Sequence, residues 1–256
     1  MKALILAAGY ATRLRPLTYR YPKELLPLAG RPIVDMILDK IAAVSAVDEI
    51  HLVTNASKAP MFAAWSPAHD VKIHNDGTTS NEDRLGAIGD ITFVVDREGW
   101  ETEDILVVAG DNLFDFSLAD YVSFWSEREG TSAIALYEHP QRDLLSQYGI
   151  VEVDPAGRLV NFVEKPEHPP SNLVSTATYI YGRAHVPLLH AYAADAQPMD
   201  APGNFIAWLY KRAPVYGYRF GGEWLDIGNR SQLLEADNRL RSQAGMPLRS
   251  EYRLED

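Results

Sequence analysis

An α/β fold with a doubly wound, mostly parallel, Rossmann-like sheet is predicted by three observations. Apolar runs at residues 4–7, 49–55 and 71–74 have the length of buried strands. A helix-period pattern at residues 33–42 and a short helix at 61–65 separate these runs, which gives the βαβαβ order of a parallel sheet with right-handed crossovers. After residue 140, alternating segments bounded by turn residues predict an antiparallel layer added beside this sheet.

The other elements follow in chain order from the same patterns. Pro32 suits the first position of a helix whose apolar face carries Ile33, Ile37 and Ile41. Beyond it, we expect strands at residues 103–109, 131–137, 148–154, 158–165, 173–181 and 215–220, and helices at residues 118–128, 184–194, 204–211 and after residue 229. His51 and His74 have no partner at metal-ligand spacing in the sequence, which favours structural or surface histidines over ligands.

Composition excludes several classes of function. A formal net charge of −11 argues against a surface for nucleic acid or anionic membrane. The chain has no cysteine, which excludes disulfides and thiolate zinc sites and fits a reducing compartment. The first strand follows Met1 so closely that no signal peptide fits, and no apolar run has membrane-spanning length. We therefore expect a cytoplasmic protein that binds neither nucleic acid nor membrane.

The loop after the first strand has the residues of an anion-binding site. Small residues at Ala7, Ala8 and Gly9 allow backbone N–H groups to approach a phosphate closely. Arg13 and Lys23 follow at the carboxyl end of the strand, where open α/β sheets bind ligands. These residues favour a cradle for a nucleoside triphosphate, and an ordinary turn with two solvated cations is the alternative.

The whole stretch from Leu6 to Pro27 resembles the signature of the sugar-1-phosphate nucleotidyltransferases. Its matching parts are Leu6-Ala7-Ala8-Gly9, Pro16-Leu17-Thr18 and Pro22-Lys23-Glu24-Leu25-Leu26-Pro27. The resemblance implies a GT-A-like nucleotidyltransferase fold, a nucleoside triphosphate and a sugar-1-phosphate as substrates, and Mg²⁺ as cofactor. It also implies that the loop binds the nucleotide through Leu6, Ala8, Gly9 and Thr12. One position departs from the family, because Ala11 stands where glycine is usual.

The segment 75–91 is a polar loop that opens into a helix and returns to the same edge of the sheet. Its Leu85-Gly86-Ala87-Ile88-Gly89 resembles the helix start against which the base and ribose lie in this family, which implies nucleotide contacts at Leu85 and Gly86. We also expect Asn75, which closes the third strand, to bond to a base edge. The loop from Asp76 to Arg84 departs from the family pattern, so the base stays open, and an ordinary capped surface loop is the alternative.

Two aspartates are candidate ligands for Mg²⁺. Asp111 ends a buried strand in Gly110-Asp111-Asn112, and Asp226 lies in Trp224-Leu225-Asp226-Ile227-Gly228; both turns resemble the metal-binding turns of the family. One or two carboxylates together with phosphate and water suffice for Mg²⁺. Capping of the following turn or helix is the alternative for each, although Asn229 or Ser231 is better placed than Asp226 to cap the last helix.

Three short stretches in the antiparallel part resemble the acceptor pocket of the family. They are Tyr148-Gly149, Glu164-Lys165-Pro166 and the segment 175–179. The resemblance implies a backbone donor at Gly149, a carboxylate for sugar hydroxyls at Glu164 and a cation for the attacking phosphate at Lys165. The other residues implied to bind the sugar phosphate are Tyr148, Ser175, Thr176 and Tyr179. A solvated ion pair is the alternative for Glu164 and Lys165, and Ala177 and Thr178 stand where Gly and Leu are more usual.

We interpret residues 1–256 as one catalytic domain for Mg²⁺-dependent nucleotidyl transfer. Residues 1–140 would bind mainly nucleotide, 141–228 mainly sugar phosphate, and 229–256 would form a C-terminal helix and tail. Three alternatives stay open: the same chemistry on a phosphocholine, phosphonate or cyclitol phosphate, a non-catalytic nucleotide-sugar sensor, and a nicotinamide dehydrogenase. The dehydrogenase lacks support because no GxGxxG follows the first strand. The base, the sugar and assembly into a homo-oligomer are left undetermined by the sequence.

Overall fold

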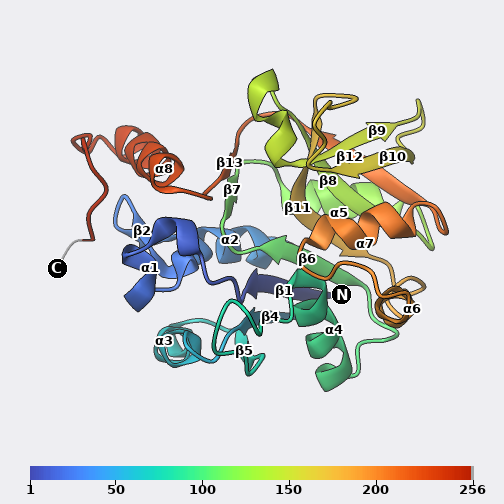
Figure 1. Cartoon of the computed structure of the whole chain (residues 1–256), viewed down its shortest axis with the longest axis horizontal. Helices are drawn as coiled ribbons and strands as arrows, with labels where there is room; N and C mark the ends of the chain where they lie inside the picture. Colours follow the sequence, from blue (N-terminus) through green and yellow to red (C-terminus); the bar gives the residue numbers. More distant parts are fainter. Residues whose placement is uncertain (255–256) are drawn as a thin grey trace.

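The computed structural model describes residues 1–254, and the strand that begins the chain lies at the centre of its main sheet (Figure 1). β1 (Lys2–Ala7) pairs in parallel with β4 (Glu49–Thr54) on one side and with β6 (Ile105–Ala109) on the other, and β5 (Lys72–Asn75) extends the sheet beyond β4. β1, β6 and most of β4 are buried apolar runs covered on both faces, as central parallel strands are, whereas β5 at the edge is partly exposed. The predicted parallel sheet is confirmed.

The antiparallel strands predicted after residue 140 belong to this same sheet. β11 (Leu173–Tyr181) pairs antiparallel with β6, and it carries β8 (Ser132–Glu138) and β9 (Gly149–Val153) as further neighbours. β10 (Leu159–Glu164) pairs with β9, and β12 (Val215–Phe220) pairs in parallel with β8. The antiparallel strands therefore extend the main sheet through the pairing of β11 with β6, and they do not form a separate layer. Ligand groups from both halves can meet along one continuous edge.

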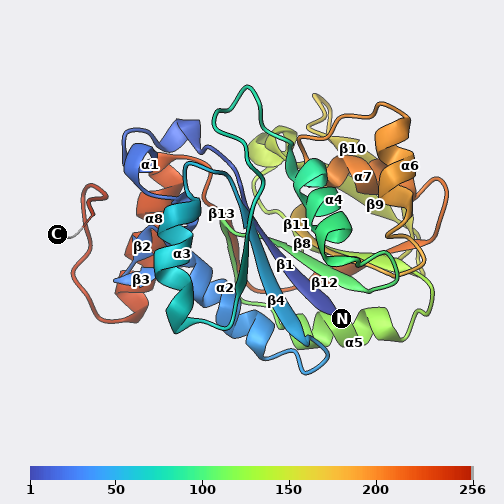
Figure 2. The same ribbon diagram turned by 90° about the horizontal axis from the view of Figure 1, so that it is seen from below.

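Helices cover the two faces of the sheet. Figure 2 shows α2 (Ile33–Ala42) and α5 (Leu118–Ser126) on one side, and α4 (Ala87–Glu98), α6 (Leu188–Ala194) and α7 (Pro202–Leu209) on the other. Alternate residues of β1 belong to the hydrophobic cores on the two faces of the sheet. Ile5 belongs to the core beneath α2, α5 and α3 (Ala59–Trp65), whereas Leu4 belongs to the core beneath α4, α6 and α7. This two-sided burial explains why the strands read as continuous apolar runs.

Helix boundaries differ from the predicted ones by a few residues, and local chemistry explains the differences. α7 begins at Pro202, which fits the first helical turn because proline lacks an N–H that would have no partner there. α6 begins only after Pro187. The Ser117 hydroxyl caps α5, accepting from the backbone N–H of Asp120 at 3.1 Å, and Asn229 caps the last helix, α8 (Arg230–Gln243), in the same way at 3.0 Å.

Two small pairings outside the main sheet position parts of the site. β7 (Asn112–Phe114) pairs antiparallel with β13 (Trp224–Asp226), and β2 (Pro27–Leu28) pairs with β3 (Arg31–Pro32). Between β1 and β2 the chain makes one short α-helix, α1 (Leu17–Arg20), and 3₁₀ turns at Thr12–Leu14 and Lys23–Leu25; further 3₁₀ turns are Ser66–Ala68 and Arg142–Gln147. Within residues 1–254, no helix combines the length and the apolarity needed to cross a bilayer.

Candidate active site

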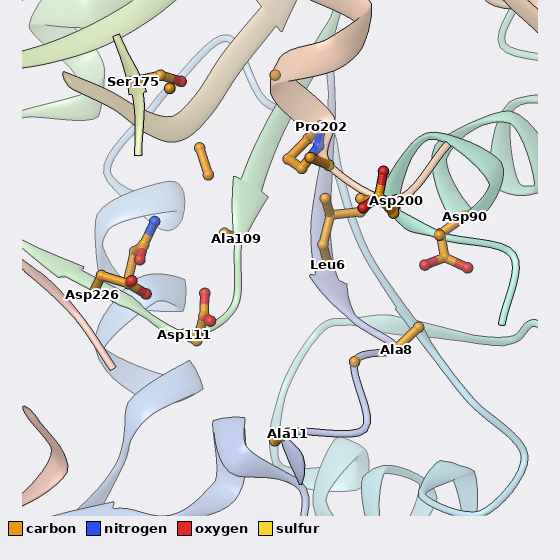
Figure 3. A pocket seen from close by; sticks show the side chains of 18 of the residues that line it. Leu6, Ala8, Ala11, Asp90, Ala109, Asp111, Ser175, Asp200, Pro202 and Asp226 are labelled. Atoms are coloured by element: carbon orange, nitrogen blue, oxygen red, sulfur yellow. The ribbon is translucent and has the colours of Figure 1, made fainter. Parts of the chain in front are cut away.

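A cavity of about 440 Å³ lies where β1 and β6 end and continues toward β9, β10 and β11. Its wall collects backbone from the loop after β1, carboxylates from several elements, and the start of α7. Figure 3 shows Asp111 and Asp226 on one side of this pocket and Asp90 and Asp200 on the other. The carboxyl edge of an open α/β sheet is the expected place for a ligand, so the position agrees with the sequence-based prediction.

Asp111 and Asp226 meet because β7 and β13 pair. The register places Asp226 opposite Asn112, and the backbone N–H of Ile227 donates to the carbonyl of Asp111 at 3.3 Å. Both side chains line the cavity, and Lys23 forms an ion pair with Asp111. Two carboxylates far apart in the sequence and one buried ammonium are thus held at one point of the wall.

Electrostatics at Asp226 shows that the predicted cations converge on it. Burial and the neighbouring charge of Asp111 raise the pKa of the Asp226 carboxyl, whereas the charges of Lys23, Arg13 and Lys165 act in the opposite direction. Burial by itself disfavours the ionised form of a carboxyl group, and the positive charges nearby offset part of this effect at Asp226. A bound cation would act in the same sense as these side chains.

Arg13 and Thr12 lie outside the lining of the cavity, on the 3₁₀ turn that follows its loop. Arg13 is exposed, and its guanidinium lies beside Gly228, just beyond Asp226. Ala11 immediately before the turn has φ of 45°. Glycine tolerates this left-handed conformation best, which explains why glycine is usual at this position in the family whose signature the sequence resembles.

Most of the predicted acceptor residues line the opposite end of the cavity. They are Tyr148, Gly149, Glu164, Lys165, Ser175 and Tyr179. The Glu164 carboxyl is 3.7 Å from the Lys165 ammonium, and burial, more than any neighbouring charge, raises the pKa of Glu164. The Ser175 and Tyr179 hydroxyls lie 3.0 Å apart in a hydrogen bond. This end therefore presents hydroxyls, one carboxylate and one cation.

The structure does not bring Thr176 to the cavity, which corrects its assignment as a sugar-binding residue. Successive side chains of a strand point to opposite faces, so Thr176 points away from the face that carries Ser175. Its fully buried hydroxyl donates to the carbonyl of Ala135 at 3.0 Å. The backbone carbonyl of Thr176 accepts from the Asn112 amide at 2.6 Å, so this residue supports the turn behind Asp111 instead.

At the nucleotide end, Leu6, Ala8, Gly9 and Gly86 line the cavity, whereas Asn75 and Leu85 do not. The Asn75 side chain is exposed and accepts from the backbone N–H of Gly77 at 2.9 Å, so it shapes the loop. Leu85 is 38% exposed. Neither prediction of a nucleotide contact is supported by where these side chains lie.

Several further polar residues line the cavity, and the sequence did not identify them as candidate site residues. They are Tyr10, Glu24, Asp76, Asn81, Arg84, Asp90, Asn112, Gln147 and Asp200. Asp90 follows Gly86 by four residues, and this helical spacing was the available signal for a shared face. Asp200 lies in a segment without periodicity, so the sequence carried no signal for it. Glu24 is buried beside Lys23, and burial raises its pKa to about 7.

Comparisons with known proteins agree with this geometry. The family model described as nucleotidyl transferase matches residues 2–243. Among curated proteins, the chain is 29% identical over 245 residues to UTP–glucose-1-phosphate uridylyltransferase AglF of Haloferax volcanii, covering 95% of this chain and 98% of that protein. It is 26% identical over 240 residues to the bifunctional protein GlmU of Methanocaldococcus jannaschii, covering 94% of this chain and 54% of the relative.

Two further matches extend the comparison. The chain is 28% identical over 239 residues to the mannose-1-phosphate guanylyltransferase catalytic subunit beta of Danio rerio, covering 91% and 63% of the two chains. A crystal structure assigned to a glucose-1-phosphate thymidylyltransferase of Bacillus anthracis, in complex with sucrose, superposes with a TM-score of 0.79 at 21% identity, over 94% of this chain and 95% of that one. The chain spans 54% to 60% of the length of the first three relatives it matches. It belongs to the nucleotidyl transferase family.

Proposed function

We propose that the protein condenses a nucleoside triphosphate with a sugar-1-phosphate to form a nucleoside diphosphate sugar and pyrophosphate. The observation that carries this proposal is the joining of Asp111, Asp226 and Lys23 at the centre of one cavity whose far end holds Glu164 and Lys165. Relatives named as uridylyltransferases and guanylyltransferases of sugar 1-phosphates support it. We place the reaction in the cytoplasm, which suits a chain without cysteine.

The proposed chemistry is an in-line displacement at the α-phosphorus. An oxygen of the sugar phosphate forms the new P–O bond, and the bond to the β-phosphate breaks as pyrophosphate leaves. A phosphate monoester is already ionised near neutral pH, so no general base is needed. Lys165 holds the attacking phosphate, Lys23 neutralises the α-phosphate region, and Arg13 and the loop at Gly9 stabilise the leaving pyrophosphate. Rate enhancement then comes from positioning and charge neutralisation.

The donor set fits Mg²⁺, which we propose as the cofactor. Asp111 and Asp226 supply carboxylate oxygens at the cavity wall, and the pKa of Asp226 is raised by burial and by Asp111, as expected where two carboxylates share a site that a cation completes. When bound, the ion would neutralise charge on the α-phosphate and orient it. The carboxylates then serve to fix the ion, and Lys23 holds Asp111 in place.

A different phosphorylated acceptor is the second candidate. Besides Glu164, the cavity wall carries Asp200, which lies against Gly86 and whose charge raises the pKa of Glu164 further. Two carboxyl groups whose charges act on each other within one cavity suit an acceptor that carries an ammonium group, such as a phosphocholine. A sugar has neutral hydroxyl groups, for which a single carboxylate suffices as hydrogen-bond acceptor.

Release of pyrophosphate tests both candidates. Purified protein is assayed with each nucleoside triphosphate against a panel of sugar 1-phosphates and phosphocholine, with Mg²⁺ and with a chelator. We expect Mg²⁺-dependent release, and Asp226→Asn or Lys165→Ala should reduce it at least about 100-fold while leaving the melting temperature unchanged within a few degrees. Lys211→Ala, at an exposed lysine that does not line the cavity, is the control. Failure to release pyrophosphate with any acceptor would overturn the proposal, and wild-type rates in a variant would remove that residue from the mechanism.

A further inference from the structure

The loop after β1 is held from behind by two side chains that the proposed mechanism does not use. Thr54 ends β4, the strand beside β1, and Asn55 follows it; both are fully buried. The Thr54 hydroxyl donates to the carbonyl of Ala7 at 3.1 Å, and the Asn55 amide donates to the carbonyl of Ala8 at 2.9 Å. Neither Thr54 nor Asn55 lines the cavity, so they can act on a ligand only through the loop.

The direction of the Asn55 amide is fixed by its other end. The Oδ1 atom accepts from the backbone N–H of Lys58 at 3.1 Å and from the Ser57 hydroxyl at 2.5 Å. Because a backbone N–H can only donate, this atom is the oxygen, and the NH₂ group faces the Ala8 carbonyl. Lys58 lies immediately before α3, so the amide joins the loop to the connection between β4 and α3.

A third hydrogen bond holds the far end of the loop. The Thr18 hydroxyl donates to the carbonyl of Ala11 at 2.9 Å, and the buried Lys58 ammonium donates to the carbonyl of Thr18 at 2.6 Å. Figure 3 shows Ala8 and Ala11 on this loop, at the side of the pocket that they line. The carbonyl oxygens of Ala7, Ala8 and Ala11 are therefore all engaged by side chains outside the cavity.

These bonds also decide where the N–H groups of the loop point. A planar trans peptide directs its C=O and its N–H in opposite directions. Since the Ala8 carbonyl points to the buried Asn55 amide, the N–H of Gly9 points the other way, and Gly9 is exposed and lines the cavity. Within residues 1–254, the backbone N–H groups of residues 8 to 11 donate to no protein acceptor. These groups are available to an anion in the cavity.

Resting on the proposed function, which puts the phosphates that leave as pyrophosphate on this loop, we propose that Asn55 and Thr54 are positioning residues for the nucleoside triphosphate. By holding the carbonyl groups of Ala7 and Ala8 back, they turn the following N–H groups toward the phosphates. Charge develops on the pyrophosphate as it leaves, and donors that are already oriented stabilise that charge best. Loss of either hydrogen bond should therefore affect the nucleotide and spare the acceptor.

Uncharged replacements test this role, with inorganic pyrophosphate and Mg²⁺ as the probe. Calorimetry needs no turnover, and Asn55→Leu and Thr54→Val roughly keep the size of each side chain. We expect the affinity for pyrophosphate to fall at least about fivefold in Asn55→Leu and about threefold in Thr54→Val, as for one lost hydrogen bond. Thr54→Ser retains the hydroxyl and should stay within about twofold of the wild type. In turnover, kcat/KM for the nucleotide should fall about tenfold in Asn55→Leu, with KM for the sugar phosphate within about twofold.

Two matched controls separate this role from general destabilisation. The Asn238 amide donates to the carbonyl of Arg249 at 2.8 Å, and its Oδ1 atom accepts from the N–H of the same residue at 2.7 Å, so it makes the same kinds of bond away from the cavity. The Thr178 hydroxyl is buried and has no hydrogen-bond partner within residues 1–254. Asn238→Leu and Thr178→Val should bind pyrophosphate as the wild type does.

An unchanged affinity for pyrophosphate in Asn55→Leu and Thr54→Val would overturn the inference, as would an equal loss in Asn238→Leu or a wild type that binds no pyrophosphate. Should Asn55→Leu fail to fold, equal affinities in Thr54→Val and Thr54→Ser would overturn it. Failure of the wild type to release pyrophosphate from any substrate pair, with pyrophosphate binding still dependent on Asn55 and Thr54, would instead refute the proposed function and leave the role of the two residues in anion binding intact.

Discussion

At the scale of single residues, Glu164 can reach the acceptor end because two glycines leave room for it. A Cβ atom placed on Gly203 would lie 3.0 Å from the Glu164 Oε2 atom and 2.7 Å from the Phe162 ring, and one on Gly149 would lie 2.9 and 2.7 Å from the same atoms. Gly149 is the register partner of Glu164, whereas Gly203 comes from the start of α7. The Glu164 carboxylate therefore fits closely between β9 and α7, because the glycines at these two positions have no side chains.

Gly203→Ala should displace Glu164 without unfolding the protein, since alanine suits a helix better than glycine. We expect kcat/KM for the sugar phosphate to fall about tenfold through KM, because a misplaced contact group weakens binding of the acceptor. Steady-state kinetics with varied acceptor measures the effect. Gly221→Ala is the control, because a Cβ atom there meets nothing within 4 Å. Equal KM values in the two variants would show that Gly203 is not needed to position Glu164.

A contiguous sequence motif was enough to indicate which side chains lie at the cavity, except where the geometry of a strand or loop decides where a side chain points. Asp111, Lys23 and Lys165 lie in contiguous motifs, and all three line the cavity. Thr176 belongs to such a motif too, but the alternation of its strand turns its hydroxyl to the far face. Asp76 and Asp90 are brought together only by the folding of a loop over a helix, which no spacing in the sequence reveals.

At the scale of elements, β4, β5 and α4 bury a histidine pair beneath the helix. His51 Nδ1 and His74 Nε2 are 2.8 Å apart, and Glu49 Oε2 lies 3.1 Å from His51 Nε2. Since the carboxylate must accept, neutral His51 donates from Nε2 and accepts at Nδ1, so His74 donates from Nε2. Its Nδ1 atom is then a buried acceptor without a donor, 3.9 Å from a Glu98 oxygen. Both histidines are buried, so neither is at the surface, and the fold brings their ring nitrogens close to the Glu98 carboxylate, a grouping that the spacing in the sequence did not reveal.

This pair should make the fold sensitive to acid. Burial, followed by the neighbouring His51, lowers the pKa of His74 to about 4, below the unfolded value of 6.5. The unfolded chain then binds more protons than the folded one between these values, so stability present above pH 6.5 is lost as the pH falls toward 4. At pH 4.5 the loss should be about 1–3 kcal/mol from this group.

Urea denaturation at pH 7.5 and pH 4.5 measures this loss, with His74→Gln as the test variant. Glutamine can still donate to His51 but cannot take up a proton, so the variant should lose less stability between the two pH values than the wild type. His190→Gln, at a half-exposed histidine, is the control and should behave as the wild type does. Identical pH dependence in the wild type and His74→Gln would exclude this role.

At the scale of the whole molecule, α8 and the segment after it contact the β2–β3 turn near the start of the chain. Asp237 on α8 is 1% exposed, and its Oδ1 atom accepts from the backbone N–H of Ala29 at 2.7 Å. The Tyr252 hydroxyl donates to the carbonyl of Pro27 at 2.8 Å. Figure 1 shows α8 beside β2, with β13 leading into it. The turn that follows Lys23 is thus anchored by residues from the far end of the chain.

Replacement of Asp237 should reveal this anchoring. Asp237→Ala leaves the Ala29 N–H without its acceptor and should reduce the free energy of unfolding by about 1–3 kcal/mol. Asp237→Asn retains an acceptor oxygen and should lose less, while Glu235→Ala, at an exposed position on the same helix, should lose little. Chemical denaturation of the three variants measures the order. A loss in Asp237→Ala no larger than in Glu235→Ala would contradict the anchor.

The order of strands in the sheet also has a consequence for how the protein is made. β1 is synthesised first, yet its two neighbours, β4 and β6, arrive only when residues 49–54 and 105–109 have emerged, and β6 still awaits β11. Pairings of such sequence separation form slowly because long loops must close first. Until residue 109 has emerged, β1 therefore has at least one side without a strand partner, and an apolar strand with an unpaired side is prone to aggregation during synthesis.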